Sequence, residues 1–488
     1  MNSPQNHPAY IGGKTYFAEE TFQAINASTG RLLGQLARCG AKEVDLAVQT
    51  ASQAQKEWAQ AAYEARAMLL NRLADALEQA APRLAQLDAE DVGRRVSEVL
   101  IDYHIAVAQY RYFAAAIVAH EDFGRPIPDG YLIAKRVPLG VVGQIIPWNV
   151  PAIMVALKVA PAIAAGNAVI LKPDENASLS TLEFARIANE IFPAGLINVL
   201  TGFGDEVGAA LTSHPGVAKL AFTGSPEVGR IISQAGAKRL VPVSLELGGK
   251  SPNIVFPDID DMDAVVDNAL FAALYCNGQS CLAGTRLFVH DAIYTEFVDK
   301  LVAAARRVRI GDPADENTQL SCLINVPQGE KVLKYIQTGR DEGAKVLTGG
   351  QRVTVKGHEH GYFIEPTILE TNNRMRVAQE EIFGPVLSVI RWSDVDEMIE
   401  QANDVCYGLA AGIYTSNLKN AMETADRLQA GNVWINRYFN LTSGSPFGGM
   451  KESGIGREHC RETLNMYSEL KAITVQNSVP QPWFAPEA

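Results

Sequence analysis

Residues 219–234 read KLAFTGSPEVGRIISQ, and this stretch decides the fold class. Residues 219–222 form an apolar run typical of a buried strand, and residues 227–234 follow a helical pattern. Between them, Thr223-Gly224-Ser225-Pro226 forms the turn that opens the helix, where free backbone N–H groups and the helix dipole favour a phosphate. The alternative is an ordinary connection between strand and helix that binds no ligand.

The same order of strand and helix extends from this stretch back to about residue 150. The expected strands are 168–171, 197–200 and 219–222, and the expected helices are 153–165, 180–192, 206–213 and 227–234. This alternation predicts a parallel sheet covered by helices on both faces, with ligands at the carboxyl ends of the strands. A second glycine signal, GFGDEVG at residues 202–208, misses the dinucleotide fingerprint by one residue and is weak.

The remaining segments follow less regular patterns. Residues 1–40 are expected to be extended and rich in turns, and residues 446–458 are too rich in glycine for regular structure. Residues 131–146 predict two strands, 132–137 and 141–146, around a Pro-Leu-Gly turn. Further helices are expected at 42–58, 64–78, 101–118, 293–308 and 330–342, with Pro82 and Gly93 as interruptions, and further strands at 286–290, 345–347, 431–436 and 467–476.

Length and composition narrow the class of protein. A chain of 488 residues, 47% of them hydrophobic, predicts two or three domains with large cores. A net charge of −12 without a dense basic patch argues against nucleic acid as a partner, and no apolar run is long enough to span a membrane. Residues 1–7 are not expected to be a signal peptide. The six cysteines form no CxxC pair and no metal-ligand spacing, which predicts free thiols in a reducing cytoplasm and no metal site.

One cysteine is a candidate nucleophile. Residues 277–284 read NGQSCLAG, so Cys281 lies between small and polar residues after an apolar, helix-like run. Glycine on both sides allows the backbone to approach a ligand closely, and a thiol in such a place can act as a nucleophile. The alternative is a buried cysteine that packs as a small hydrophobic residue.

Polar side chains also follow three of the expected strands. Asn149 could offer its side-chain N–H groups to a ligand oxygen, although an Asx-type turn is an alternative. Glu246 ends an apolar run, and a desolvated carboxyl there would have a raised pKa that suits a general base; a solvated carboxylate is the alternative. Lys172 and Glu175 could hold a ribose, and Glu175 with Asp174 would repel a 2′-phosphate, unless both belong to a solvated loop.

Taken together, these segments resemble the NAD(P)-dependent aldehyde dehydrogenase superfamily over nearly the whole chain. Any one motif is weak, but seven of them occur in the family's order. They are Pro147-Trp148-Asn149, Lys172-Pro173-Asp174-Glu175, Phe222-Thr223-Gly224-Ser225, Glu246-Leu247-Gly248-Gly249-Lys250, Gly278-Gln279-Ser280-Cys281-Leu282-Ala283, Glu381-Ile382-Phe383-Gly384-Pro385 and Pro446-Phe447-Gly448-Gly449.

The resemblance implies a role for each matching residue. Cys281 would be the nucleophile, Glu246 the base that activates the hydrolytic water, and Asn149 would hold the oxyanion together with the backbone N–H of Cys281. Lys172 is counted with both the catalytic and the cofactor residues. The implied contacts of the cofactor, NAD, are Ile145, Trp148, Lys172, Glu175, Gly224, Ser225, Glu381 and Phe383. The implied lining of the substrate tunnel is Ile105, Val150, Met154, Leu157, Leu282, Phe439 and Leu441.

The resemblance also implies the architecture. The fold would be α/β and aldehyde-dehydrogenase-like, with a Rossmann-type parallel-sheet NAD-binding domain at residues 1–120 and 139–248 and an α/β catalytic domain at residues 249–465. Residues 121–138 and 466–488 would form a small β oligomerisation arm, with the 131–146 hairpin and the C-terminal strand as its elements. Strand edges left unpaired in a monomer predict a homodimer or homotetramer.

The implied activity is oxidation of a small to medium aliphatic or aromatic aldehyde to the acid with NAD⁺. The steps would be a thiohemiacetal on Cys281, hydride transfer, and hydrolysis of the thioester assisted by Glu246. A thiol hydrolase or acyltransferase is one alternative, but the eight histidines lie outside every motif. A non-catalytic relative would usually lack the cysteine or the glutamate, and a CoA-acylating relative generally lacks the glutamate.

Overall fold

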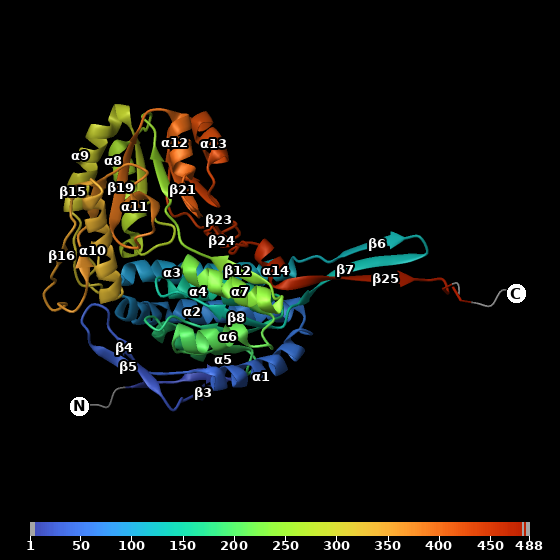
Figure 1. The fold of residues 1–488 in the computed structure, drawn as a ribbon. Coiled ribbons are helices and arrows are strands. Elements are labelled where there is room, and N and C mark those ends of the chain that lie inside the picture. Colours follow the sequence, from blue (N-terminus) through green and yellow to red (C-terminus); the bar gives the residue numbers. More distant parts are fainter. Residues whose placement is uncertain (1–4, 481–482, 485–488) are drawn as a thin grey trace.

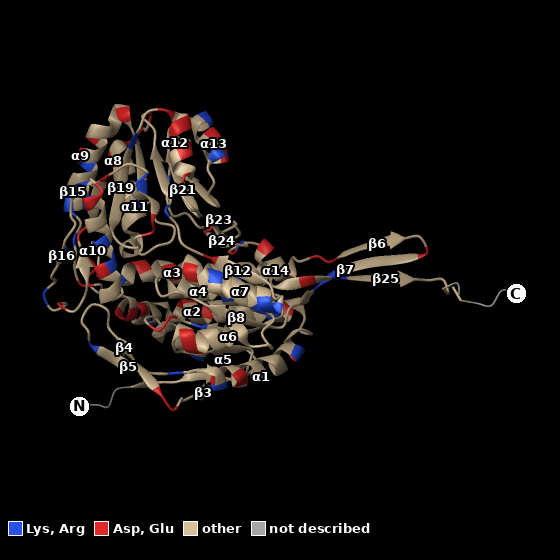
Figure 2. Cartoon of the chain, in the orientation of Figure 1, with Lys and Arg blue, Asp and Glu red and all other residues tan. Residues whose placement is uncertain are grey.

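The computed structural model describes residues 5–480 and 483–484, which form two lobes and a projecting arm (Figure 1). Residues 1–4, 481–482 and 485–488, which the predicted domains include, lie outside the described residues. The lower lobe in Figure 1 contains the N-terminal half of the chain, and the upper lobe contains most of the C-terminal half. Lys and Arg residues (blue) and Asp and Glu residues (red) are interspersed along the ribbon of both lobes (Figure 2).

An eight-stranded sheet forms the centre of the lower lobe, in the order β24-β12-β11-β8-β9-β10-β2-β3. Its strands are β2 (Ala9–Ile11), β3 (Lys14–Tyr16), β8 (Val141–Ile145), β9 (Ala168–Lys172), β10 (Ile197–Val199), β11 (Lys219–Thr223), β12 (Val243–Glu246) and β24 (Gly454–Ile455). The five strands from β12 to β10 are parallel, and every residue of β9 and β11 is buried. The predicted parallel sheet is therefore confirmed, because full burial of a strand requires cover on both faces.

Helices surround this sheet, and most begin where the sequence predicts. They are α1 (Ala41–Trp58), α2 (Tyr63–Val92), α3 (Val96–Val118), α4 (Pro151–Ala164), α5 (Leu179–Asn189), α6 (Ala209–Ser213) and α7 (Pro226–Arg239). The expected end at residue 78 is wrong, because α2 continues through Pro82 and ends at Gly93, which has a left-handed φ of 77°. The expected helix 206–213 begins instead as a π-helical turn, η1 (Gly204–Gly208), and only its second half is α6.

The upper lobe contains a seven-stranded sheet in the order β15-β18-β19-β14-β13-β21-β22. Its strands are β13 (Pro252–Val255), β14 (Arg286–His290), β15 (Lys345–Thr348), β18 (Thr367–Glu370), β19 (Val386–Trp392), β21 (Ala410–Tyr414) and β22 (Asn432–Ile435). Its helices are α8 (Met262–Leu274), α9 (Tyr294–Arg306), α10 (Val326–Asp341), α11 (Arg376–Gln379), α12 (Val395–Asn403) and α13 (Leu418–Arg427). Leu287 and Val289 pack in one hydrophobic cluster with α8 and α9, while Phe288 packs in another with α12. This alternation covers both faces of the sheet.

Short elements complete the two lobes. They are the strands β1 (Asn6–His7), β4 (Thr21–Ile25), β5 (Leu32–Ala37), β16 (Arg352–Val353), β17 (Phe363–Ile364), β20 (Tyr407–Gly408) and β23 (Met450–Lys451), the turns η2 (Tyr275–Gly278) and η3 (Asp291–Ile293), and the helix α14 (Glu462–Met466). The glycine-rich stretch 446–458 is thus not wholly irregular. It contains β23 and β24, and β24 pairs with β12 so that Gly454 lies opposite Glu246. A Cβ at Gly454 would lie 2.3 Å from the Leu245 carbonyl oxygen, so this pairing requires glycine.

The arm is a three-stranded antiparallel sheet of β6 (Phe123–Ile127), β7 (Gly130–Pro138) and β25 (Ser468–Gln476), in the order β25-β7-β6. The expected 131–146 hairpin is wrong, because its second half is β8, which lies in the lower-lobe sheet between β9 and β11. All residues of β8 except Ile145 are buried, whereas residues 131–136 of β7 alternate between exposed and half-buried. Burial on both faces therefore assigns β8 to the lobe and not to the arm.

Candidate active site

The chain reverses direction sharply before Cys281. Helix α8 ends at Leu274, and Cys276, Asn277 and Gly278 then have consecutive left-handed φ values of 58°, 56° and 72°. A Cβ at Gly278 would lie 2.3 Å from the carbonyl group of Gly384, so this position requires glycine. Left-handed conformations at non-glycine residues are held only where surrounding contacts enforce them, which marks this turn as a strained one.

Two buried side chains of the motif enforce the turn. The Asn277 amide donates to the carbonyl oxygens of Cys322 at 2.8 Å and Gly93 at 3.2 Å, and its oxygen accepts from the Ser321 N–H at 2.9 Å. The Gln279 side-chain oxygen accepts from the Ile324 N–H at 3.0 Å. The sequence analysis assigned no role to either residue, although polar side chains between glycines in a motif were an available signal.

Asn149 lies beside this turn, just after β8. Its side chain is buried, and Nδ2 donates to the Gln279 carbonyl oxygen at 2.9 Å, two residues before Cys281. The predicted oxyanion donor and the predicted nucleophile are therefore brought together from positions 132 residues apart in the sequence. The carbonyl oxygen of Asn149 is itself bonded, because it accepts from Cys276 Sγ and Arg94 Nη1, each at 3.3 Å.

Glu246 is the last residue of β12 and is buried. Among the described residues neither of its carboxyl oxygens has a hydrogen-bond partner. Burial and then the nearby Glu458 carboxyl raise its pKa well above the ordinary value, while Lys158 and Arg457 act in the opposite direction. Lys158 Nζ donates to Glu458 Oε1 at 2.5 Å, and the sequence analysis missed this buried pair. A carboxyl of raised pKa can accept a proton near neutral pH, as the prediction for Glu246 requires.

Burial also controls the thiol. It raises the pKa of Cys281 to about 12, and the carboxyl groups of Glu381 and Glu246 add to the effect. A thiol with this pKa is protonated at neutral pH and is a poor nucleophile. Attack by Cys281 therefore requires a base that removes the proton or a positive charge brought close to the sulfur.

A cavity of about 190 Å³ opens at Cys281 at the ends of the lower-lobe strands. Its lining comprises Pro147, Trp148, Asn149, Met154, Thr223, Gly224, Ser225, Leu247, Gly248, Cys281, Gln328, Lys331, Glu381 and Phe383. Segments from five of the seven motifs therefore meet in this cavity. Gln328 and Lys331 of α10 were not predicted, because their segment carries no motif.

The polar groups of this cavity fit a nucleotide. The Thr223 hydroxyl is buried and has no partner within the described part of the chain, so it is available to a ligand. The N-terminus of α7 faces the same cavity through Gly224 and Ser225, and such a terminus favours phosphate. A Cβ at Gly224 would lie 2.4 Å from the Phe222 ring, so a larger residue there would require this ring to move.

Glu381 and Phe383 line the opposite wall. Glu381 Oε1 accepts from the Gly249 N–H at 3.0 Å, and burial raises the pKa of this carboxyl to about 6. The Phe383 ring lies edge-on to Trp148 with centroids 5.3 Å apart. The wall therefore pairs one carboxylate with two aromatic rings, which suits a ligand that has both hydroxyl groups and a flat ring.

Lys172, Glu175 and Ile145 lie outside this lining. Lys172 is buried and its Nζ donates to Glu175 Oε2 at 3.1 Å, while Ile145 is its register partner in the sheet. Glu175 lines a neighbouring cavity of about 410 Å³ together with Asn176 and Asn325. The structure thus places all three at the carboxyl ends of β8 and β9, next to the cavity at Cys281 and not within it.

Of the seven expected substrate-pocket residues, Met154 lines the cavity with Cys281. The other six are Ile105, Val150, Leu157, Leu282, Phe439 and Leu441, which belong to or pack on the same hydrophobic core, with Cys281 at its margin. Phe439 lies among Phe271, Tyr275, Trp434 and Tyr438, with centroid separations of 4.9 to 6.2 Å. The Tyr438 hydroxyl donates to the Leu282 carbonyl oxygen at 2.8 Å, which ties this aromatic group to the residue after Cys281.

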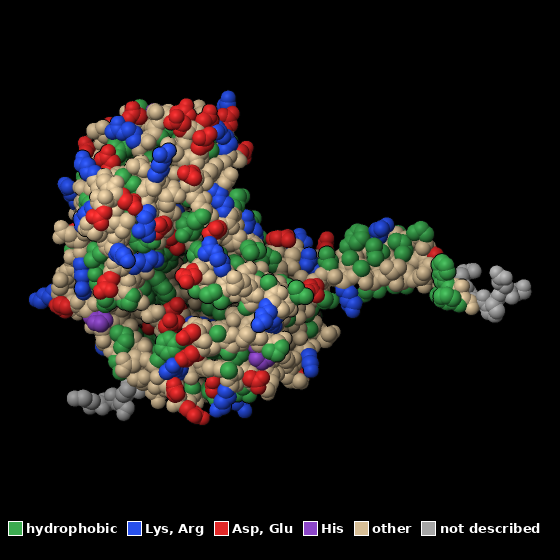
Figure 3. All heavy atoms as spheres, viewed as in Figure 1, with side chains coloured by type: hydrophobic (Ala, Val, Ile, Leu, Met, Phe, Trp, Pro, Cys, Tyr) green, Lys and Arg blue, Asp and Glu red, His purple; other side chains and the backbone are tan. Residues whose placement is uncertain are grey.

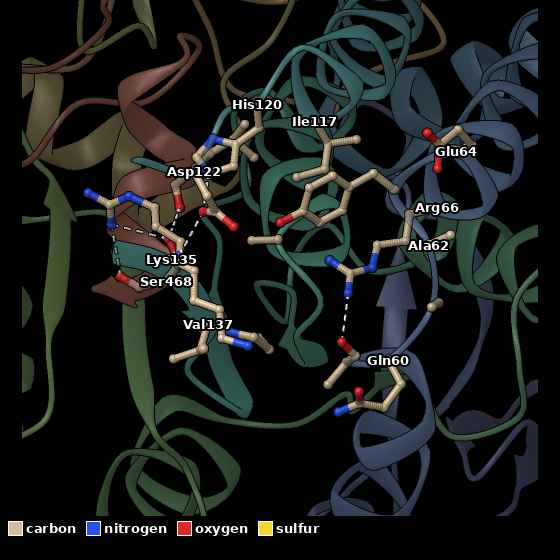
Figure 4. A pocket seen from close by; sticks show the side chains of 17 residues that line it. Gln60, Ala62, Glu64, Arg66, Ile117, His120, Asp122, Lys135, Val137 and Ser468 are labelled. Carbon is tan, nitrogen blue, oxygen red and sulfur yellow. Dashed lines mark hydrogen bonds and ion pairs between the residues drawn. The ribbon is translucent and has the colours of Figure 1, made fainter. Parts of the chain in front are cut away.

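A larger cavity, of about 530 Å³, lies at the base of the arm (Figure 4). Its lining includes Tyr63, Arg66, His120, Asp122 and Lys135, and the described residues around it include no cysteine. The Arg66 guanidinium donates to the carbonyl oxygens of Ala59 at 2.9 Å and Ala164 at 3.2 Å, at the C-terminal ends of α1 and α4. Its positive charge therefore stabilises two helix ends, and we assign this cavity to the junction of arm and lobe.

Residues 5–480 and 483–484 contain neither a membrane-spanning helix nor a cluster of metal-ligating side chains. None of the helices there combines the length and the apolar character that crossing a membrane would require. The same residues contain no cluster of three or more His, Cys, Asp or Glu side chains able to hold a metal ion.

Comparisons with known proteins agree with this geometry. A sequence profile of the Aldehyde dehydrogenase family matches residues 16–473. A putative aldehyde dehydrogenase, DhaS, from Bacillus subtilis is 43% identical over 474 residues, which are 96% of this chain and 95% of that protein. Among solved structures, an NAD⁺ complex of an aldehyde dehydrogenase from Bacillus cereus has a TM-score of 0.94 at 39% identity, with 97% of each chain covered. The indole-3-acetaldehyde dehydrogenase AldA of P. syringae has a TM-score of 0.94 at 38% identity and the same coverage.

These matches define a class of α/β oxidoreductases that act on aldehydes. The chain belongs to the aldehyde dehydrogenase family, and it is an enzyme that oxidises aldehydes. The predicted family and fold class are confirmed.

Proposed function

We propose that the protein oxidises an aldehyde to the carboxylic acid with NAD⁺ through a covalent intermediate on Cys281. The observation that carries this proposal is the convergence of Cys281, Asn149, Glu381 and Phe383 on one cavity at the strand ends. The Bacillus cereus relative, described as an NAD⁺ complex, supports the choice of cofactor.

The residues of this chain can be assigned to the parts of NAD⁺. Glu381 and Phe383 would hold the nicotinamide ribose and ring, and Gly224 and Ser225 the pyrophosphate. Lys172 and Glu175 would hold the adenosine ribose, with Ile145 beside Lys172 in the sheet and Trp148 beside Phe383. When bound, NAD⁺ supplies a hydride acceptor next to Cys281.

The first chemical step is release of the Cys281 thiol proton to solvent water, which the positive charge of bound NAD⁺ would favour. The resulting thiolate attacks the aldehyde carbon and gives a thiohemiacetal alkoxide. The alkoxide accepts hydrogen bonds from the Asn149 Nδ2 group and the Cys281 N–H. In this structure Asn149 Nδ2 donates to the Gln279 carbonyl oxygen, so a small rotation of the side chain would redirect it to the alkoxide. One such donor contributes about 3–4 kcal/mol in comparable acyl chemistry.

Loss of hydride from the alkoxide leaves a thioester on Cys281, and Glu246 then serves as the base for hydrolysis. Its oxygens have no partner among the described residues, and its raised pKa allows it to take a proton from water. The water adds to the thioester carbon, the C–S bond breaks, and the acid leaves. Glu246 returns the proton to solvent before the next turnover.

The substrate is proposed to be a small to medium aliphatic or aromatic aldehyde. The support is the apolar character of Met154, Phe439, Leu282 and Leu441, which favours an uncharged substrate. The test is a panel of aldehydes with NAD⁺ or NADP⁺, read by absorbance of the reduced cofactor. Cleavage of a thioester or ester panel without any reduction of the cofactor would favour a thiol hydrolase instead.

A homodimer or homotetramer is proposed for the assembly. The arm strands β6 and β25 are sheet edges, and the arm exposes Phe123, Tyr131 and Leu470, which are 55%, 56% and 66% exposed. Figure 3 shows hydrophobic side chains gathered along the arm. Such edges are normally covered. Light scattering at the mass of one chain would contradict this proposal.

The compartment is proposed to be the cytoplasm. All six cysteines are free thiols in the structure, and four of them are buried at Cys39, Cys276, Cys322 and Cys460. Free thiols persist in reducing compartments. Fractionation of the native cell is the test.

A further inference from the structure

An ion pair buried beneath the active site has no role in the chemistry proposed above. Arg94 follows Gly93 at the end of α2, and its guanidinium forms a salt bridge with Asp102 of α3. The two side chains are each only 1% exposed. The phenol of Tyr275 donates to Asp102 Oδ1 at 2.8 Å, and the Arg94 guanidinium lies 5.5 Å from the Tyr275 ring centroid.

Arg94 also reaches the predicted oxyanion residue. Its Nη1 donates to the carbonyl oxygen of Asn149 at 3.3 Å. Asn149 lies in the irregular link between β8 and α4. Its carbonyl group is therefore not held by the regular hydrogen bonds of a helix or a strand. The contact with Arg94 and the one with Cys276 Sγ, also at 3.3 Å, are the bonds that hold this carbonyl.

The same segment holds the turn before the nucleophile. The Gly93 carbonyl oxygen accepts from the Asn277 amide at 3.2 Å, in the middle of the left-handed turn. Gly93 and Arg94 are neighbours, so one short segment contacts Asn149 on one side and Asn277 on the other. Tyr275, at the start of the turn, is tied to the same ion pair through Asp102.

We propose that Arg94 is a positioning residue. It fixes the backbone of Asn149 against the turn 275–278, so that the Asn149 amide faces the alkoxide oxygen of the thiohemiacetal on Cys281. The proposal rests on the proposed function of Asn149 as oxyanion donor. Arg94 itself does not touch the substrate, and it acts through Asn149.

Stability alone does not account for this arrangement. A buried ion pair is often no more stabilising than apolar side chains of the same volume. An arginine is distinguished by its several fixed donors. The Nη1 group of Arg94 pairs with Asp102 and also reaches the Asn149 carbonyl oxygen. A lysine could keep the charge pair with Asp102 but has a single ammonium group and a shorter reach.

The test is a double-mutant cycle that compares Arg94→Met in the parent and in an Asn149→Ala background. The readout is the pre-steady-state burst of reduced cofactor at saturating aldehyde and NAD⁺. We expect Arg94→Met to slow the burst about ten-fold or more in the parent and less than about three-fold in Asn149→Ala, because coupled residues lose their effects together. Equal losses in both backgrounds would overturn the proposal.

Arg94→Lys separates position from stability. We expect it to recover the melting temperature lost in Arg94→Met while the burst stays slow. Recovery of both would show that charge alone matters and would overturn the proposal. If Arg94→Met does not fold, Tyr275→Phe removes one hydrogen bond to Asp102 and is compared in the same two backgrounds. An Asn149→Ala enzyme with a normal burst would contradict the proposed function of Asn149, an outcome that is distinct from uncoupled Arg94 effects.

Discussion

Two buried carboxyl groups on opposite sides of Cys281, Glu246 and Asp102, differ in whether their oxygens have hydrogen-bond partners. Toward β11 and β12, the Glu246 carboxyl and the Thr223 hydroxyl have no partner within residues 5–480 and 483–484. Toward α2 and α3, both oxygens of Asp102 are bonded, and Asn277 uses its amide and its oxygen. An unsatisfied buried polar group costs about 1–3 kcal/mol, so the fold tolerates such groups only where something else requires them.

This difference separates residues that react from residues that position. The Glu246 carboxyl, which has no partner among the described residues, is available to a water or a reacting atom, whereas the Asp102 carboxyl, with both oxygens bonded, holds the structure around it. The predictions below test this division, beginning with the largest expected effect.

Replacement of the nucleophile has the largest effect. We expect Cys281→Ala to abolish both dehydrogenase and esterase activity, because no other cysteine lines the cavity at the strand ends. The control is Cys406→Ser, since Cys406 is an exposed thiol outside this cavity and should leave both activities unchanged. Substantial turnover by Cys281→Ala would mean that the covalent step is misassigned.

Replacement of the base is expected to affect one step only. Glu246→Gln should lower steady-state turnover by about a thousand-fold, within the range for loss of a general base. The burst of reduced cofactor should remain, because hydride transfer precedes the step that Glu246 assists. Rapid mixing measures both phases, and loss of the burst would show that Glu246 acts before hydride transfer.

Removal of the oxyanion donor should weaken the earlier step. Asn149→Ala should lower the burst rate by about a hundred-fold, as expected for loss of one preorganised donor. The control is Asn440→Ala, an exposed asparagine that lies outside this cavity. If Asn149→Ala slowed only the steady-state phase, Asn149 would not be a residue that acts in the step before hydride transfer.

Cofactor choice should depend on Glu175. We expect the parent to prefer NAD⁺ over NADP⁺ by about ten-fold or more in kcat/KM, since about 1.4 kcal/mol of repulsion gives that factor. Glu175→Gln should reduce the preference, with Lys172 then free to approach a 2′-phosphate. Equal use of both cofactors by the parent would show that Lys172 and Glu175 do not distinguish NAD⁺ from NADP⁺.

The smallest expected effect is on stability. The pKa of Glu246 is raised by burial, so the folded protein retains this proton at pH values where the unfolded chain has released it. Its contribution to stability is therefore lost as pH rises above about 4.5. A glutamine at position 246 cannot ionise, so Glu246→Gln removes this pH-dependent loss of stability. The substitution should raise the melting temperature by about 2 °C or more at pH 8, and by less at pH 5. Exposed Glu57→Gln is the matched control, and an equal shift at both pH values would contradict this reading.

Most of the active-site prediction came from local patterns in the sequence. Apolar runs that end in Asn149, Lys172 and Glu246 can be recognised in the sequence, and parallel strands bring their carboxyl ends to one edge. The roles of Cys281, Glu381 and Phe383 depended on family resemblance, because a cysteine between glycines is compatible with simple packing. The site roles themselves stay predictions until the variants above are measured.

The sequence by itself determined the alternation of strands and helices and, through seven motifs in order, the family, because each strand, helix and motif depends on a pattern within about twenty residues. Only the tertiary structure decided that β8 joins the lobe, that β24 pairs with β12, and that Lys158 meets Glu458 across 300 residues. It also decided the position of Arg94 beneath Asn149, 55 residues away. These contacts join segments whose local patterns carry no information about each other, since the partner of a buried polar group is chosen by the packing of the whole chain.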